Sequence, residues 1–316
     1  MFSNVTWTTI DPSVEPAHFS RFPVGIANNT EEVTAALNRA IEAAAVPGSR
    51  EKKKALIRHA DPGNEPFAIC HCTGEPERLV VLSTIIELAW INDDVTEELT
   101  HTKAMVKHQI LMEAMELDKL VSAPIGYFNQ RELFFGLAVQ KAVKMDPESG
   151  SKMISVLSNY LLTFDDSAED FATMDEYNPY RVGNCGYWIS SYFIRWGLGF
   201  DLTDSEYELI REFDFSMGII LGLTNDYFSW SIEKDQVTDR TRNAVRVLMK
   251  EHGVEDTAAR SLLRGLIILE EEKAHRLKQK ALNATPPPSS AVLRYIDAIE
   301  LYVGGSCYWH ATAPRA

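Results

Sequence analysis

The chain has 316 residues, of which 45% are hydrophobic and 24% are charged. This composition is typical of a globular protein with a substantial core. The formal net charge of −14 argues against nucleic-acid binding, which requires a basic face. An anionic phosphate ligand is compatible with this charge if metal ions and a few arginines reverse its sign locally.

The four cysteines form no disulfide framework, and the N-terminus lacks the apolar core of a signal peptide. No apolar run approaches the roughly 20 residues needed to span a bilayer. We therefore expect a cytoplasmic protein. Cys70-His71-Cys72 could suggest zinc, but no second pair of ligands follows at a useful spacing, so we interpret this segment as structural.

Apolar residues recur with helical periodicity along most of the chain, and strand-like alternation is scarce. We expect helices over 30–46, 50–59, 76–92, 99–121, 130–144, 148–164, 185–197, 204–232, 239–252, 255–282 and 290–303. Breaks are expected at Asp61-Pro62-Gly63-Asn64, Pro124-Ile125-Gly126, Asp146-Pro147 and Asn178-Pro179.

A proline-rich stretch over 283–290 resembles an inter-domain linker, but only 26 residues follow it, too few for a second domain. We expect an extended loop that leads to one last helix. The sequence thus predicts one domain over 1–316, an all-α bundle around a central apolar cavity.

An acidic cluster follows the apolar run that ends at Ile91. Asp93, Asp94 and Glu97 lie directly after it, with Trp90 one turn before Asp93 or Asp94 on the expected helix. Paired carboxylates at a cavity mouth suit Mg²⁺, which uses few protein ligands. The same Asp-Asp-x-x-Glu spacing recurs from Asp165, so this pattern alone is weak evidence for a metal site.

The second cluster is more specific. Asn225, Ser229 and Glu233 are each four residues apart, so a helix would present all three oxygen donors on one face. Gly222 and Gly218 lie one and two turns before Asn225, respectively. Because glycine costs about 1 kcal/mol relative to Ala inside a helix, we favour a bulky ligand against this backbone over close helix packing.

These motifs resemble those of class I terpene synthases, and of the cyclase domain of fungal bifunctional terpene synthases such as fusicoccadiene and variediene synthases in particular. Asn225-Asp226-x-x-Ser229-x-x-x-Glu233 is similar to their Asn/Ser/Glu metal motif, and Asp93-Asp94-x-x-Glu97 to their aspartate-rich motif. Arg181-Val182-Gly183-Asn184-Cys185-Gly186 resembles the segment with their diphosphate-sensing Arg and a helix break. The final Trp309-His310, followed by Arg315, resembles their C-terminal segment.

The resemblance implies how these residues act. Asp93 would bridge two Mg²⁺ ions, and Asn225, Ser229 and Glu233 would hold the third, while Asp94 and Glu97 would act indirectly or through water. Arg181, Arg315 and, less directly, Lys234 would bind diphosphate together with Asn225. Loss of diphosphate would leave a carbocation in a π-rich cavity. The aromatic candidates for its walls are Phe67, Trp90, Trp188, Tyr192 and Trp309.

The position upstream of Arg181 favours Asp93 over Asp165 as the aspartate-rich motif. Residue 316 is Ala where the family has Tyr, which is consistent with an excised domain or an altered last residue. The resemblance also implies a covalently linked prenyltransferase domain in the full-length protein, which this chain does not include. A homo-oligomer is left open.

The reaction implied is Mg²⁺-dependent cyclisation of geranylgeranyl diphosphate to a polycyclic hydrocarbon, catalysed by a carbon–oxygen lyase. Three alternatives remain. A C25 (sesterterpene) cyclase shares every motif. An isoprenyl diphosphate synthase would carry a second aspartate-rich motif, where this chain has Asn/Ser/Glu. A helical scaffold with solvated acidic patches would bind neither Mg²⁺ nor diphosphate.

Overall fold

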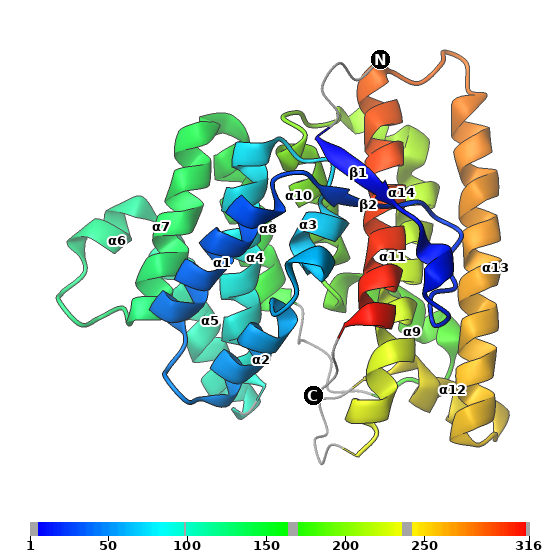
Figure 1. Cartoon of the computed structure of the whole chain (residues 1–316), viewed down its shortest axis with the longest axis horizontal. Coiled ribbons are helices and arrows are strands. Elements are labelled where there is room, and N and C mark those ends of the chain that lie inside the picture. Colours follow the sequence, from blue (N-terminus) through cyan, green and yellow to red (C-terminus); the bar gives the residue numbers. More distant parts are fainter. Residues whose placement is uncertain (1–5, 98, 164–169, 236–241, 314–316) are drawn as a thin grey trace.

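The computed structural model describes residues 6–97, 99–163, 170–235 and 242–313, and it is helical over most of these ranges (Figure 1). The all-α prediction is confirmed. The α-helices are α1 Thr30–Ala44, α2 Arg50–Arg58, α3 Pro66–Cys70, α4 Pro76–Thr96, α5 His101–Met115, α6 Leu117–Ser122, α7 Gln130–Met145, α8 Pro147–Thr163, α9 Met174–Asn184, α10 Tyr187–Gly197, α11 Asp204–Glu233, α12 Ala244–His252, α13 Asp256–Leu282 and α14 Ser290–Thr312.

Two short strands, β1 Trp7–Ile10 and β2 Val24–Ala27, pair in antiparallel register with Trp7 opposite Ala27. Gly25 allows this pairing to pack tightly, since a Cβ at that position would lie 2.5 Å from the Trp7 ring. The sheet packs against α3 and α14, so the N-terminal segment covers the middle of the bundle (Figure 1).

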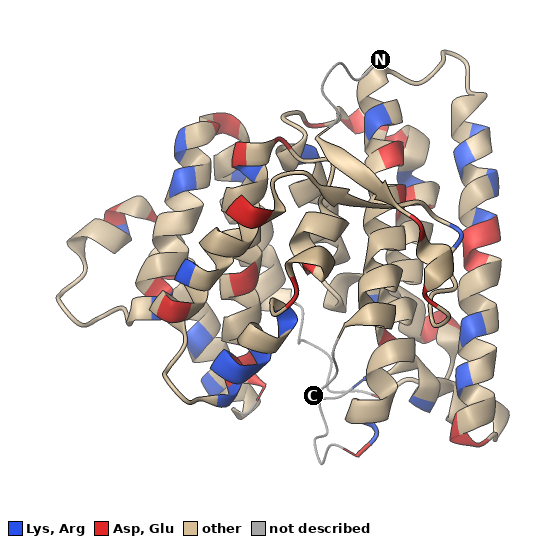
Figure 2. Cartoon of the chain, viewed as in Figure 1, with Lys and Arg blue, Asp and Glu red and all other residues tan. Residues whose placement is uncertain are grey.

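The helices form two neighbouring groups (Figure 1). One hydrophobic cluster joins α9, α11, α12, α13 and α14, and a second joins α1, α4, α5, α7 and α8. Helix α10 contributes to both clusters, through Ile194 to the first and Phe193 to the second. Charged residues of both signs are scattered along outer helices such as α13 rather than gathered on one face (Figure 2).

Most of the predicted helices are confirmed within a few residues, two differ in extent, and two further helices are present. The helices α3 and α9 were not expected. The expected helix over 99–121 is two helices, separated at Glu116, whose backbone is extended (φ −84°, ψ 116°). The last helix continues to Thr312 rather than ending at residue 303. The proline-rich stretch is a connection to that last helix, as predicted.

The expected break at Asn178-Pro179 is wrong, because Pro179 lies inside α9. Proline removes one intrahelical hydrogen bond, and the helix persists because Tyr177 and Val182 are fully buried in the cluster with α11.

Glycines explain the longer last helix. A Cβ at Gly304 would lie 2.3 Å from the Pro23 carbonyl oxygen, so Gly304 allows α14 to run close past the start of β2.

No helix in the described part of the chain is both long enough and apolar enough to cross a membrane.

Candidate active site

Three helices, α9, α11 and α14, meet around the Asn225 side chain of α11. Arg181 of α9 donates a hydrogen bond from Nη2 to Asn225 Oδ1 at 2.7 Å. The Asn225 Nδ2 atom lies 3.4 Å from Nε2 of His310 on α14. Next to it in sequence, Trp309 lies 6.1 Å from Trp90 of α4, ring centroid to ring centroid. The helix that carries the Asp-Asp pair is thus joined to the Asn/Ser/Glu helix through α14.

The Asn/Ser/Glu side chains occupy successive turns near the end of α11, a 30-residue helix. Residues four apart lie above one another on a helix. Two of these side chains also approach a common atom, because Asn243 Nδ2 lies 2.9 Å from Glu233 Oε2 and 3.4 Å from Ser229 Oγ. The structure therefore brings Asn225, Ser229 and Glu233 to one face, as their spacing predicts.

Arg181 is a buried cation held by three partners. It donates to Asn184 Oδ1 at 2.6 Å and to Asn225 Oδ1 at 2.7 Å, and its Nη2 lies 2.7 Å from Asp226 Oδ1. Burial opposes its charge, but the Asp226 carboxylate raises the pKa of Arg181 above its usual value. Arg181 therefore stays charged beside the carboxamide.

Asp226 fixes the start of α12 against α9 and α11. Its Oδ2 accepts hydrogen bonds from the Tyr177 hydroxyl at 2.6 Å and from the Ala244 backbone N–H at 2.9 Å. Burial raises the pKa of Asp226 to about 6, although Arg181 acts in the opposite direction. The sequence places Asp226 within the Asn/Ser/Glu motif but does not reveal this anchoring role.

The helix break expected after Arg181 is present. Helix α9 ends at Asn184, and α10 begins at Tyr187. Gly186 between them has φ of +75°, in the left-handed region that favours glycine. The turn keeps Arg181 and Asn184 in the last turn of α9, facing α11.

The aspartate-rich cluster lies in the last turn of α4, which extends to Thr96. Both carboxylate oxygens of Asp94 are engaged by α2: Lys54 Nζ lies 2.6 Å from Oδ1, and Arg58 Nη1 lies 2.8 Å from Oδ2. Lys54 also lies 3.2 Å from Glu97 Oε2. Asp93, partly exposed, accepts at its backbone oxygen from the Glu97 N–H. Asp94 and Glu97 thus have cationic partners on α2, and their expected indirect roles stay a prediction.

A buried ionic chain continues from this cluster into the protein. Arg58 also donates to Glu87, which lies on α4, and Glu87 in turn contacts the ring of His59 at 2.8 Å. The other ring nitrogen of His59 lies 2.8 Å from Glu65. Burial alone would lower the pKa of His59, but the hydrogen bonds and charges of Glu65 and Glu87 raise it to about 9. The sequence signal that was missed is Glu87, a carboxylate within an apolar run.

Three of the five aromatic candidates lie together. The Trp90 ring is 4.9 Å from Phe67 and 6.1 Å from Trp309, centroid to centroid. Trp188 lies elsewhere: it is 41% exposed and packs on Phe215 of α11.

Tyr192 is also remote from this group, because its hydroxyl donates to the Ser149 carbonyl and its ring packs among α8 and α10 residues. The five predicted wall residues are thus three neighbouring rings and two rings that pack on other residues, and their role as cavity walls stays a prediction.

The interpretation of Gly218 and Gly222 as a floor for a ligand is wrong. A Cβ at Gly222 would lie 2.8 Å from Cγ of Arg181, and one at Gly218 would lie 2.8 Å from both Val182 and Tyr187. The two glycines therefore let α9 and α10 pack closely on α11. They position Arg181 instead of contacting a ligand themselves.

The remaining candidates fall outside this group. Lys234 lies at the end of α11 and faces Asp256 Oδ2 at 3.5 Å, on the side toward α13. Arg315, Ala316 and the alternative Asp165-Asp166 pair lie outside the described residues.

The segment Cys70-His71-Cys72 is poorly exposed. Burial raises the pKa of Cys72 to about 12 and lowers that of His71 to about 3. Both shifts fit the structural interpretation of this segment.

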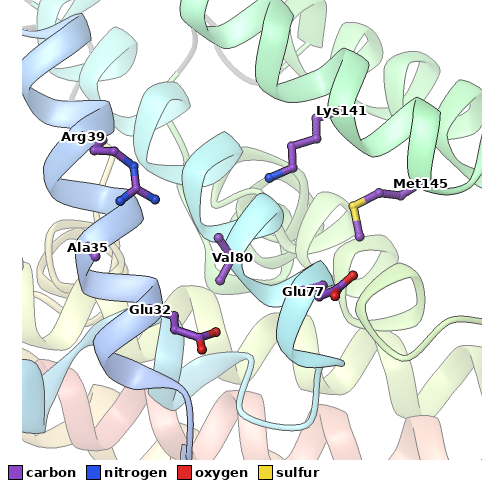
Figure 3. A pocket seen from close by; sticks show the side chains of 7 residues that line it. All are labelled: Glu32, Ala35, Arg39, Glu77, Val80, Lys141 and Met145. Atoms are coloured by element: carbon purple, nitrogen blue, oxygen red, sulfur yellow. The ribbon is translucent and has the colours of Figure 1, made fainter.

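A pocket of about 440 Å³ on the outer surface is unrelated to these residues. It lies between α1, α4 and α7, with Arg39 and Lys141 on one side of Val80 and Glu32 and Glu77 on the other (Figure 3). Glu77 begins α4, sixteen residues before Asp93, which is about 24 Å along the helix axis.

The donor set fits a small, hard cation. Asn225, Ser229 and Glu233 each offer an oxygen, the ligand atom that Mg²⁺ prefers, and the last two converge on the Asn243 amide. Among the described residues, no three His, Cys, Asp or Glu side chains are grouped to hold a metal. A site here would therefore use the carboxamide and hydroxyl oxygens.

Comparison with known proteins agrees with this geometry. Residues 84–273 match "Terpene synthase family 2, C-terminal metal binding". Bifunctional terpene synthase FUP1 of Fusarium proliferatum is 27% identical over 309 residues, covering 95% of this chain and 41% of that protein. Sesterterpene synthase btcA of Colletotrichum orbiculare is 27% identical over 251 residues, and fusicoccadiene synthase of Phomopsis amygdali is 29% identical over 263 residues. Each of these two alignments covers 76% of this chain and 35% of the relative. The chain thus spans about two fifths or less of these relatives.

Among solved structures, aristolochene synthase from Penicillium roqueforti superposes with a TM-score of 0.79 at 16% identity, over 95% of this chain and 99% of that one. The fold is therefore that of the class I terpenoid synthase helical bundles, as predicted. The chain belongs to terpene synthase family 2, and its resemblance to fungal terpene synthases is confirmed. Membership implies use of a divalent metal and fits a lyase acting on diphosphates.

Proposed function

We propose that this chain is a Mg²⁺-dependent class I diterpene cyclase that ionises geranylgeranyl diphosphate and cyclises the resulting carbocation to a polycyclic hydrocarbon. One observation carries the proposal: the buried Arg181 guanidinium contacts the Asn225 carboxamide at 2.7 Å, beside Ser229 and Glu233 on the next turns. A diphosphate would be held both by this cation and by a metal ion bound to the neighbouring oxygen atoms.

The residue roles follow from this arrangement. Asp93 would bridge two Mg²⁺ ions at the end of α4, and Asn225, Ser229 and Glu233 would hold a third at the end of α11. Bound Mg²⁺ would supply the positive charge that stabilises diphosphate as a leaving group. Arg181 would donate hydrogen bonds to the diphosphate, as would Arg315, which lies outside the described residues.

The aromatic group on α3, α4 and α14 would serve the hydrocarbon part of the reaction. The Trp90 ring lies between those of Phe67 and Trp309, with centroids 4.9 Å and 6.1 Å away. Each cation–π contact with a carbocation would contribute about 0.5–2 kcal/mol. Phe67 is buried and Trp90 is partly buried, which suits a site that must exclude water.

Chain length of the substrate is the open choice within this function. We favour a C20 diphosphate, and a C25 diphosphate is the second candidate because one relative is named a sesterterpene synthase. An isoprenyl diphosphate synthase is less favoured, since Asn225 and Ser229 stand where a second aspartate-rich motif would be expected. A non-enzymatic scaffold accounts for neither the family match nor the Arg181–Asn225 contact.

We also propose that the chain acts as one domain in the cytoplasm, joined in the full-length protein to a prenyltransferase domain that would supply its substrate. The name of one relative, a bifunctional terpene synthase, supports this arrangement. Homo-oligomerisation is a further proposal, which sedimentation of the chain would test.

The decisive experiment incubates the chain with Mg²⁺ and C15, C20 or C25 diphosphates and identifies the hydrocarbons by gas chromatography–mass spectrometry. We expect a cyclic C20 product and release of diphosphate. Asn225→Ala should abolish turnover, while Asn129→Ser at the start of α7 should retain it. Full activity of Asn225→Ala would refute the metal assignment. Conversion of the added diphosphate to a linear, longer diphosphate when isopentenyl diphosphate is also supplied would favour the synthase alternative.

A further inference from the structure

The side chain of Asn243 links the start of α12 to the proposed metal ligands. Asn243 is 1% exposed and occupies the N-cap of α12, where its Oδ1 accepts a hydrogen bond from the Val245 N–H at 2.9 Å. A capping residue needs only this acceptor. The amide nitrogen of Asn243 is therefore available for a separate role.

That nitrogen contacts α11 at three levels. Asn243 Nδ2 lies 3.1 Å from the Asp226 carbonyl oxygen, 3.4 Å from Ser229 Oγ and 2.9 Å from Glu233 Oε2. The contacts cover two turns of the helix, from Asp226 to Glu233. They approach two of the three side chains that the proposed function assigns to one metal ion.

We infer that Asn243 is a positioning residue, which holds Ser229 and Glu233 in the orientation required to bind the metal. The inference rests on the proposed function. Glu233 is the last residue of α11 and is only partly buried. A free glutamate loses rotamer entropy when it is fixed by an ion. The hydrogen bond from Asn243 fixes one carboxylate oxygen in advance and leaves the other for the ion.

The start of α12 does not depend on this amide for its place. The Ala244 backbone N–H donates to Asp226 Oδ2 at 2.9 Å, and Ala244, Val245 and Leu248 are fully buried. Replacement of the Asn243 amide should therefore alter the ligands of the metal more than it alters the fold.

The test is Asn243→Ser, which keeps a capping hydroxyl and removes the amide donor. Loss of a group that orients a metal ligand typically weakens metal affinity 10- to 100-fold. We expect the dissociation constant of Mg²⁺, measured by isothermal titration calorimetry in the presence of inorganic diphosphate, to rise by that factor. The melting temperature without ligand should stay close to that of the parent chain.

The matched control is Asn129→Ser. Asn129 caps α7 through the same type of hydrogen bond, to the Glu132 N–H at 3.0 Å, and α7 contributes nothing to the metal ligands. This variant should bind Mg²⁺ as the parent does. Asn243→Gly is a second test variant, because glycine caps a helix nearly as well as asparagine.

An unchanged Mg²⁺ affinity in Asn243→Ser or Asn243→Gly would overturn the inference, and so would failure of both variants to fold, which would make Asn243 purely structural. Asn225→Ala separates this outcome from failure of the proposed function. If Asn225→Ala loses Mg²⁺ binding while the Asn243 variants keep it, only the positioning role is wrong. If Asn225→Ala also binds normally, the metal assignment itself is wrong.

Discussion

Replacement of Gly222 by alanine should impair the site through Arg181 although it adds only one methyl group. The new Cβ would lie 2.8 Å from Arg181 Cγ, about 0.7 Å closer than the 3.5 Å at which two carbons attract best. Arg181 would have to move by a similar distance, away from Asn225. A misplacement of about 1 Å in a positioning group can reduce turnover 100-fold, so we expect a loss of that order.

The effect on stability should be small because two contributions oppose each other. Alanine gains up to about 1 kcal/mol of helix propensity over glycine, while overpacking costs about 1–3 kcal/mol. We expect a net loss of between zero and about 2 kcal/mol. Gly265→Ala is the matched control: Gly265 lies within α13, is exposed, and a Cβ there would have nothing within 4 Å. It should therefore gain about 1 kcal/mol.

Urea denaturation gives the unfolding free energies of both variants, and gas chromatography–mass spectrometry gives their hydrocarbon yield. The pair separates helix propensity from the close approach of α9. If Gly222→Ala is stabilised as much as Gly265→Ala and turns over substrate at the parental rate, Gly222 does not constrain Arg181 and the reasoning fails.

Three further predictions follow from the same contacts. In Arg58→Ala, the buried carboxylates of Glu87 and Asp94 lose their guanidinium partner, so the free energy of unfolding in urea should fall by about 3–5 kcal/mol. A change near zero would contradict this pairing. His59 has a folded-state pKa of about 9, above its usual value near 6.5, so its stabilising contribution is complete below pH 6.5 and is lost as the pH rises toward 9. Unfolding free energies measured from pH 6 to 9.5 should decline by up to about 1.4 kcal/mol per pH unit, and His59→Gln should remove that slope. Trp90→Ala should change the mixture of hydrocarbon products because Trp90 lies at the centre of the aromatic group. Trp188→Ala should leave the mixture unchanged because Trp188 is 41% exposed and packs on Phe215 of α11. Identical product profiles for both variants would show that Trp90 does not line the cavity.

Periodicity predicted the long helices well because their apolar faces are local in sequence. The expected helix over 204–232 is α11, Asp204–Glu233, and its start is fixed by a capping box between Thr203 and Glu206. Where tertiary packing overrides a local signal, the prediction failed. Pro179 reads as a helix end, yet burial of Tyr177 and Val182 against α11 keeps α9 helical around it.

The same distinction applies to the site. Asn225, Ser229 and Glu233 could be predicted because their relation is a fixed spacing within one helix. Their partners could not, since Arg181 and Asn243 reach them from α9 and α12, across contacts that depend on how three helices pack. The two glycines show the limit most clearly. Sequence alone does not reveal whether a glycine faces a ligand or another helix, and here they face α9 and α10.

The two acidic ends of the proposed site are stabilised differently, and this difference bears on how each would respond to a metal. Asp94, at the end of α4, already has both carboxylate oxygens paired with Lys54 and Arg58. Any direct role for Asp94 would first require those ion pairs to break. Among the described residues, Ser229 and Glu233 on α11 lie within hydrogen-bond distance of the neutral amide of Asn243. An ion that approaches Ser229 and Glu233 meets this neutral donor, whereas at Asp94 it would have to displace two cations, so the electrostatic cost of binding is lower at α11.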